Sequence, residues 1–131
     1  MKLAICTDVF ADLSYTDMLD KVKSLGIDAV EMTAGGWGAR KHCNTAELLA
    51  DEGKRKEFMG ELEKRGMRIS ALNTSCNPLW PSKTGEEYKK SMYDCATLAG
   101  LLGVKKIVAM AGLPAGNEPD TTPNWIPSTV S

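Results

Sequence analysis

The feature that most constrains this sequence is a return from helix to strand that recurs three times in the same form. An amphipathic segment ends in a glycine and an apolar run starts at once, at Gly26-Ile27, Gly66-Met67 and Gly103-Val104. The residue after a helix commonly takes a left-handed conformation, which glycine adopts without steric cost. Strands that alternate with helices in this way predict an α/β fold with parallel strands and right-handed crossovers.

Hydrophobic periodicity places the expected elements. Apolar runs predict strands near residues 2–6, 27–32, 67–72 and 104–110. Helices are expected from Ser14, where Asp17 completes a capping box, over residues 54–65, and from Thr84, with Glu87 as its partner. A short helical piece is expected at residues 45–51. The predicted buried helix positions are Met18, Leu19, Val22, Leu25, Phe58, Met59, Leu62, Tyr88, Met92, Cys95, Ala96, Ala99 and Leu102.

This regular order is compatible with either a (β/α) barrel or a doubly wound sheet. Helices on one face of the sheet would exclude the doubly wound arrangement, in which helices cover both faces. The stretch "CTDVFADLS" after the first strand contains no glycine. It therefore lacks the phosphate-binding fingerprint of a dinucleotide fold.

Length and charge limit the classes of function. The chain has 131 residues, a length that suits one domain over residues 1–131. Its 16 Lys and Arg residues nearly balance 17 Asp and Glu residues, so charge gives no reason to expect nucleic acid or an anionic membrane as a partner. No apolar run approaches the roughly 20 residues that span a bilayer, and the N-terminus reads as a strand, not as a signal peptide.

The cysteines predict reduced thiols and not a metal centre. Cys6, Cys43, Cys76 and Cys95 are far apart in the sequence and show no zinc-ligand spacing. Without a secretory signal, free thiols in the cytoplasm are expected. A metal site made from these cysteines and His42 is a remote alternative, because isolated cysteines usually behave as small buried hydrophobic residues.

Polar side chains follow each predicted strand. In parallel α/β folds, ligands bind at the carboxyl ends of the strands. Four groups should therefore converge on one rim: Thr7 and Asp8, Glu31, the stretch from Asn73 to Asn77, and Gly112. Carboxylate, amide and hydroxyl groups together suit a polyhydroxylated ligand.

Each of these residues also has a purely structural interpretation. Asp8, Asn73 and Asn77 can hold turns, and His42 can be a solvated loop residue. Glu31 follows a buried strand, where an unpaired charge is costly, so it needs a partner or a ligand. The tryptophans of the loops can stack on a sugar face or cover apolar surface; they are Trp37, Trp80 and Trp125.

The ordered motifs resemble one known family. The stretches "GIDAVEM", "GGWGARKHCN", "ELLAD", "RISALN", "NPLWP" and "AGLPAGNEPDTTPNWI" together resemble the sugar phosphate isomerase/epimerase family of xylose isomerase-like TIM barrels. The family's loop after the third strand reads "HGNPLHP" or "SGNPLHP". This chain has "SCNPLWP", with Cys76 in place of the glycine and Trp80 in place of the later histidine.

The resemblance implies a fold and an activity. The fold would be the N-terminal half of a (β/α)8 barrel, with about four parallel strands and three main helices on the outer face, because a full barrel takes about 250 residues. The activity would be metal-assisted proton transfer on a ketose or polyol through an enediolate. The substrate-binding residues would be Glu31, His42, Asn73, Ser75, Asn77 and Trp80.

The resemblance also implies what this chain lacks. The family's divalent metal is held by Glu, Asp and His residues of later strands, so we expect no metal ligands and little activity from this chain alone. Catalytic residues are not assigned. Residues 111–131 are expected to form an irregular Pro-rich tail.

Two non-enzymatic alternatives stay open. The first is a half-barrel that assembles with itself or with a complementary chain, because open strand edges and an uncovered face favour association. The second is a doubly wound domain that binds a small molecule.

Overall fold

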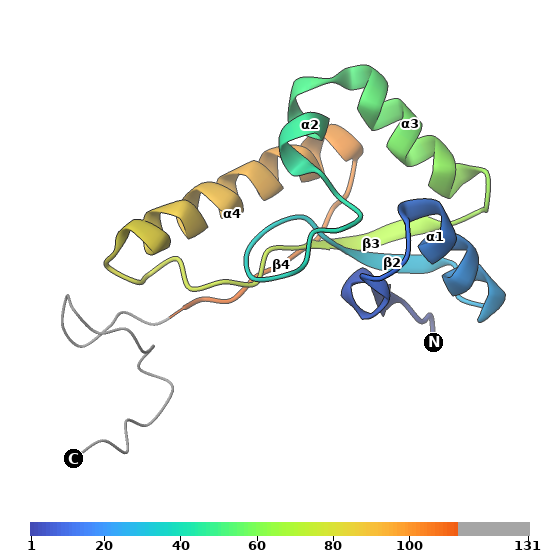
Figure 1. Cartoon of the computed structure of the whole chain (residues 1–131), viewed down its shortest axis with the longest axis horizontal. Coiled ribbons are helices and arrows are strands. Elements are labelled where there is room, and N and C mark those ends of the chain that lie inside the picture. Colours follow the sequence, from blue (N-terminus) through green and yellow to red (C-terminus); the bar gives the residue numbers. More distant parts are fainter. Residues whose placement is uncertain (113–131) are drawn as a thin grey trace, which may run out of the picture.

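The computed structural model describes residues 1–112, which form one four-stranded sheet and its helices (Figure 1). The Pro-rich tail predicted from residue 111 lies almost entirely outside the described residues, as does Trp125. The elements are β1 (Ile5–Cys6), η1 (Thr7–Phe10), α1 (Tyr15–Ser24), β2 (Ala29–Thr33), α2 (Thr45–Ala50), α3 (Glu52–Glu63), β3 (Arg68–Asn73), α4 (Lys83–Leu102) and β4 (Ile107–Val108).

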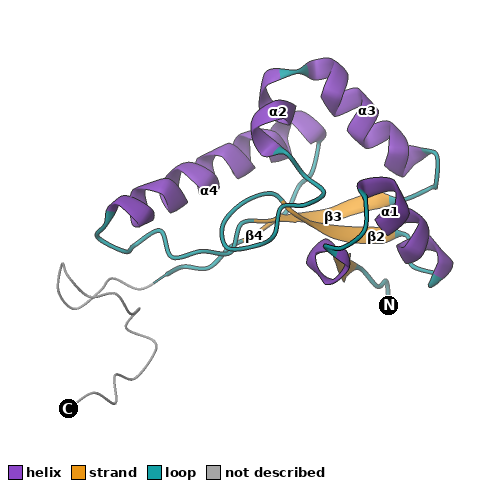
Figure 2. Cartoon of the chain, in the orientation of Figure 1, coloured by secondary structure: helices purple, strands orange, loops and turns teal. Residues whose placement is uncertain are grey.

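All four strands are parallel, and sequence neighbours are also neighbours in the sheet. The order is β1-β2-β3-β4, with no reversal. When every right-handed crossover moves in the same direction across a sheet, every helix falls on the same face. The helices indeed lie on one side of the strands (Figures 1 and 2). This confirms the partial barrel and overturns the doubly wound alternative.

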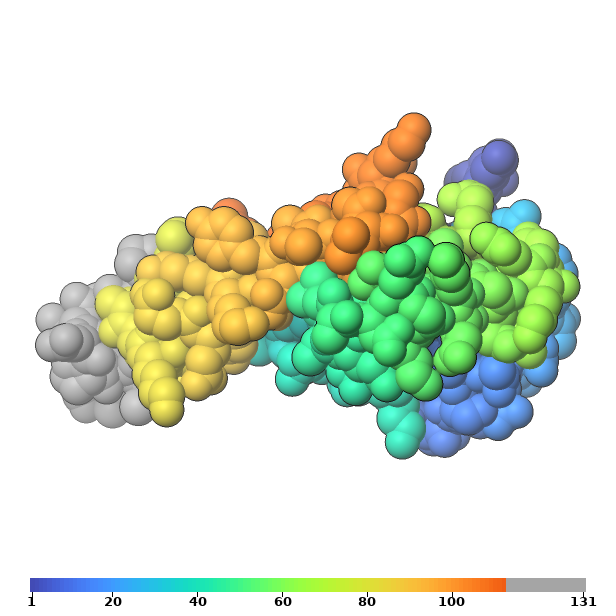
Figure 3. Space-filling view, turned by 90° about the horizontal axis from the view of Figure 1, so that it is seen from above, coloured from blue at the N-terminus to red at the C-terminus, as the bar shows by residue number. Residues whose placement is uncertain are grey.

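One apolar cluster joins the helices to that face. In α1, Met18, Leu19 and Val22 are fully buried, and Leu62 of α3 and Leu98 of α4 are equally inaccessible. All of them belong to the cluster that contains the strand residues Val30, Met32 and Leu72. From the helix side, α2 and α3 lie beside α4 and cover the sheet (Figure 3).

The helix ends follow local chemistry. The Ser14 hydroxyl accepts a hydrogen bond from the Asp17 N–H at 3.2 Å, as the capping box predicts. The returns at Gly26, Gly66 and Gly103 have φ of 76°, 62° and 71°, so all three predicted turns are left-handed.

Several element boundaries differ from the prediction. Helix α4 starts earlier than expected because Ser82, not Thr84, caps it by accepting the Gly85 N–H at 3.1 Å. Helix α3 starts at Glu52 because Asp51 caps the Lys54 N–H at 3.1 Å. Strands β1 and β4 are only two residues long, since among the described residues each pairs on one side only.

Two predicted positions on the helix faces are corrected, and one buried position was missed. Leu25 is 52% exposed, because α1 ends at Ser24 and the chain turns away from the core. Ala96 is exposed because it lies about 100° around the helix from Cys95, outside the apolar stripe. Leu98, which the sequence reading missed, is fully buried instead.

A β-bulge at Ser70 sets which side chains of β3 face the helices. Val30 pairs with Ile69, but Glu31 pairs with Ala71, so Ser70 is an extra residue in the ladder. Its hydroxyl donates to the Val30 carbonyl at 3.0 Å. The bulge allows Ile69 and Leu72, three residues apart, to pack on the same core, whereas strict alternation would place them on opposite faces.

No helix within residues 1–112 combines the length and apolar character that crossing a bilayer requires.

Replacing Leu62 by Ala should lower the free energy of unfolding by about 2–5 kcal/mol, because it leaves a cavity in a fully buried position. Urea unfolding followed by circular dichroism measures the loss. The matched control is Leu25→Ala, which should change stability by about 0.5 kcal/mol or less because Leu25 is exposed. Equal losses for the two variants would contradict the assignment of the core.

Thiol reactivity should separate Cys6 from the other cysteines. Cys43, Cys76 and Cys95 are buried, and burial raises the pKa of the Cys43 and Cys95 thiols to about 11 and that of Cys76 in the same direction. Because the thiolate is the reactive form, a colorimetric thiol reagent should label half-buried Cys6 first and the rest after denaturation. Rapid labelling of a Cys6→Ser variant would overturn this expectation.

Candidate functional site

The candidate site lies on the face of the sheet opposite the helices, at the carboxyl ends of the strands. Residues paired directly across parallel strands project to the same side of the sheet. Thr33 pairs with Asn73, and Glu31 pairs with Ala71 and with Cys6. Their neighbours Met32 and Leu72 point into the helix-side core. Glu31, Thr33 and Asn73 therefore share the opposite face.

The Asn73 side chain connects the site. Its Nδ2 donates to Glu31 Oε1 at 2.6 Å, and its Oδ1 accepts the Ser75 N–H at 2.8 Å. One amide thus binds the carboxylate of the neighbouring strand and shapes the loop that follows its own strand. Asn73 is therefore the partner that the sequence predicts for the Glu31 carboxylate.

Around this centre lies a shell of small polar groups. Thr7 is buried, and its hydroxyl accepts the Thr33 N–H at 3.4 Å. Gly38 packs so closely on Thr33 and Asp8 that an added Cβ would collide with both side chains. The start of the β2–α2 connection therefore folds back toward the end of β1, and it brings Asp8 close to the rim.

The β2–α2 connection is also fastened to the β3–α4 loop and to α4. The Trp37 N–H donates to the Ser75 carbonyl at 2.9 Å, and the Trp37 indole Nε1 donates to the Tyr88 hydroxyl at 2.9 Å. The Gly36 N–H donates to Ser91 Oγ at 2.9 Å. These bonds give the site a fixed wall.

Two predicted residues lie near this wall but are packed differently. Asn77 is only 1% exposed, and Gly112 approaches it so closely that a Cβ on Gly112 would collide with Asn77 Oδ1. Trp80 is half-buried at the start of α4, where its carbonyl accepts the Ser82 N–H at 2.9 Å.

His42 lies elsewhere. It is buried, and its Nε2 is 3.0 Å from the Leu13 carbonyl oxygen. It lines a cavity of about 450 Å³ together with Tyr15 and Phe58 of the helix layer. The structure thus brings Glu31, Asn73 and Ser75 together and separates His42 from them. A substrate-binding role for His42 stays an untested prediction.

The sequence reading missed Thr33 and Ser91 as parts of this wall, and it named Trp37 only as an aromatic of the loops. Thr33 could have been found, because it is two residues beyond Glu31 and alternation places both on one face. The contacts of Ser91 could not have been found, since a serine within a helix carries no signal of the loops that it binds.

The described residues do not fit a metal centre on their own. Within residues 1–112 no group of three or more His, Cys, Asp or Glu side chains lies close enough to hold an ion. Near the rim lie two carboxylates, Asp8 and Glu31, and Glu31 is already engaged by an amide. The divalent metal that the family resemblance implies would need ligands from outside these residues, and no chemical step is derived through it.

Comparisons with known proteins agree with this fold. A curated relative, the uncharacterized protein YfiH of Bacillus subtilis, is 50% identical over 131 residues; the match covers 100% of this chain and 42% of YfiH. The crystal structure of the probable 3-DHS dehydratase AsbF of Bacillus anthracis, described as involved in petrobactin synthesis, is similar with a TM-score of 0.60 and 22% identity. That match covers 86% of this chain and 39% of AsbF, and it shows the fold alone.

A family model described as xylose isomerase-like TIM barrel matches residues 19–126, which is most of the chain. The match extends across β2, β3 and α4, the elements that build the candidate site. This chain belongs to the xylose isomerase-like TIM barrel family.

Proposed function

We propose that this chain forms one wall of a binding site for a sugar or sugar phosphate, and that the whole protein is an isomerase or epimerase acting on a ketose or polyol. Family membership supports the barrel context. The observation that carries the proposal is the Glu31–Asn73–Ser75 arrangement at the carboxyl ends of β2 and β3. In barrels of this type, this is the end at which ligands bind.

The chemistry of the wall suits hydroxyl groups. Asn73 uses its amide on Glu31 Oε1 and the Ser75 N–H, so both partners are held in position before a ligand arrives. Among residues 1–112, the second oxygen of Glu31 and the Ser75 hydroxyl make no hydrogen bond. A carboxylate oxygen accepts and a serine hydroxyl donates or accepts, so adjacent hydroxyls of a polyol can satisfy both.

The proposed role of Glu31 is to bind and orient the ligand. A charge-assisted hydrogen bond from a substrate hydroxyl to a carboxylate is stronger than a neutral one. Proton transfer during isomerisation would need further groups, and the residues described here supply none with a defined role in that step. A metal bound by other parts of the protein would polarise the sugar carbonyl.

Binding of a ketose should depend on Glu31 and Asn73. Fructose and fructose 6-phosphate are suitable probes, with nuclear magnetic resonance shifts of the Asn73 and Ser75 amides as the measurement. Glu31→Gln and Asn73→Ala should each weaken binding about tenfold, the loss expected for one charge-assisted hydrogen bond or for the support of one.

The control for this experiment is Glu63→Gln, which removes an exposed carboxylate at the end of α3. It should leave binding unchanged. Ketose binding without any shift at Asn73 or Ser75, or equal affinities for all three variants, would contradict the proposal.

A second proposal concerns assembly. Ile107, Val108 and Met110 are 41%, 38% and 38% exposed, and among the described residues β4 pairs only with β3. An apolar edge strand is a template for further strand pairing. We propose that this edge binds another chain, either a second copy or a complementary half-barrel.

Sedimentation should therefore give a mass above the 14.2 kDa of one chain. Val108→Lys should shift the protein toward the monomer, because a charge on an edge strand opposes pairing. Val9→Lys is the matched control, since Val9 is 64% exposed outside the sheet. A wild-type protein that sediments as a monomer at all concentrations would rule out self-assembly and leave only a different partner chain.

A further inference from the structure

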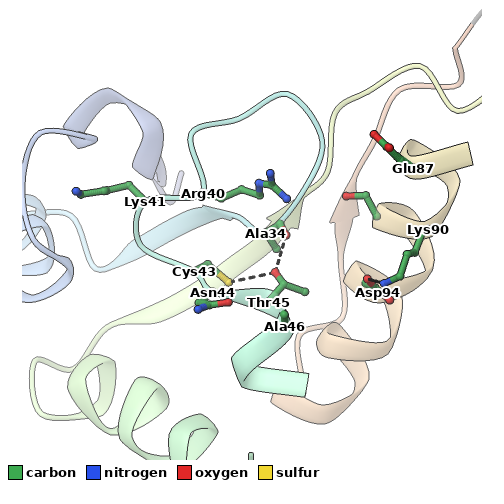
Figure 4. Close-up of a pocket in the computed structure, with 11 residues that line it drawn as sticks. Ala34, Arg40, Lys41, Cys43, Asn44, Thr45, Ala46, Glu87, Lys90 and Asp94 are labelled. Carbon is green, nitrogen blue, oxygen red and sulfur yellow. Dashed lines mark hydrogen bonds and ion pairs between the residues drawn. The ribbon is translucent and has the colours of Figure 1, made fainter. Parts of the chain in front are cut away.

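A cavity of about 600 Å³ lies outside the sheet, between the β2–α2 connection and α4 (Figure 4). One wall carries Arg40, Asn44 and Thr45, and the other carries Glu87, Ser91 and Asp94. None of Glu31, Asn73 and Ser75 lines it, so it is distinct from the candidate site. Its volume is within the range of small-molecule sites.

The two walls carry opposite unpaired charges. Arg40 extends from the connection toward α4, whereas Lys41 points away from α4 (Figure 4). On α4, Lys90 and Asp94 neutralise each other in an ion pair, which leaves Glu87. Within residues 1–112, neither the Arg40 side chain nor the Glu87 side chain makes a hydrogen bond or an ion pair, although the Arg40 carbonyl accepts the Cys43 N–H at 3.4 Å. The cavity thus has one free guanidinium on one wall and one free carboxylate on the other.

The backbone at Arg40 is strained. Its φ of 49° is the only positive value at a non-glycine residue among the described residues. This conformation costs an L-residue roughly 1–2 kcal/mol. Strain of this kind persists where the surroundings fix it, and it is concentrated at ligand sites. Here the residues two and three positions later anchor the turn, because His42 and Cys43 are both buried.

The walls of the cavity are held in place before any ligand binds. The Thr45 hydroxyl donates to the Ala34 carbonyl at 2.5 Å, and Ser91 Oγ accepts the Gly36 N–H at 2.9 Å. These two bonds fasten both ends of the connection, one of them directly to α4. A preformed site loses less free energy on ordering when a ligand binds.

We propose that this cavity binds a small zwitterion, with its carboxylate against Arg40 and its ammonium group against Glu87. A guanidinium is well matched to a carboxylate, with which it forms paired hydrogen bonds. A dianion such as phosphate would be repelled by Glu87, and a simple cation would be repelled by Arg40. Only a ligand that carries both charges satisfies both walls.

Three probes that share a four-carbon chain test the charge requirement: γ-aminobutyrate, butyrate and butylamine. Nuclear magnetic resonance shifts of the Thr45 and Ser91 amides report occupation of the cavity. The zwitterion should bind about fivefold more tightly than either singly charged probe, because each exposed charge contact contributes up to about 1 kcal/mol. Equal affinity for the three probes would overturn the proposal.

Charge variants locate the two contacts. Arg40→Gln and Glu87→Gln should each weaken γ-aminobutyrate binding about fivefold, whereas Arg68→Gln, at an exposed arginine on β3, should not. The double exchange Arg40→Glu with Glu87→Lys should restore the binding that either exchange alone removes, because the ligand can then bind in the reversed orientation. Failure of this restoration would overturn the assignment of the two walls.

Two further variants separate binding from folding and from the proposed function. Arg40→Gly removes both the charge and the strain, so it should weaken γ-aminobutyrate binding while thermal stability is kept or raised. Asn73→Ala should leave γ-aminobutyrate binding unchanged, although it should weaken ketose binding about tenfold. Shifts that appear at Asn73 and Ser75, and not at Thr45 and Ser91, would show that the zwitterion occupies the other site.

Discussion

The helices of this chain can bury their apolar stripes against only one face of the sheet, because strands that are consecutive in sequence are also neighbours in the sheet. The stripes of α1, α3 and α4 meet on Val30, Met32 and Leu72, which are inaccessible to solvent. The alternate residues of the same strands must then project to the other face. Polar side chains such as Glu31 and Asn73 can occupy that second face without any loss of core packing.

Strand pairing and the candidate site are coupled through one amide. Asn73 pairs with Thr33 in the ladder and at the same time donates to Glu31, so any slip of β3 against β2 would break both contacts. Its acceptor atom also fixes Ser75, the second residue of the following loop, and the Trp37 N–H binds the carbonyl of the same residue. Errors in the ladder would therefore reach the loops that form the wall. This dependence explains how two short strand ends can hold polar groups in fixed positions.

Much of the fold could be predicted from the sequence. Gly26, Gly66 and Gly103 marked all three returns, because glycine at a helix end has a local cause, and the convergence of Glu31 with Asn73 followed from the rule for strand ends. The destination of His42 could not be predicted, since its hydrogen bond to Leu13 joins segments 29 residues apart. The start of α4 was misplaced because two serine or threonine caps competed, and the earlier one formed. The family resemblance was confirmed, whereas the substrate role of each rim residue stays a prediction.

The bulge at Ser70 reverses the alternation of core-facing residues along β3. Before the bulge the odd-numbered residue Ile69 packs on the core, whereas after the bulge the even-numbered residue Leu72 does. Deleting Ser70 alone would restore a regular ladder and leave Ile69 and Leu72 two residues apart, so both would stay on the core face. Loss of one residue at this point of β3 should therefore be tolerated. A single deletion within β2 would instead move the residues that follow it to the opposite face.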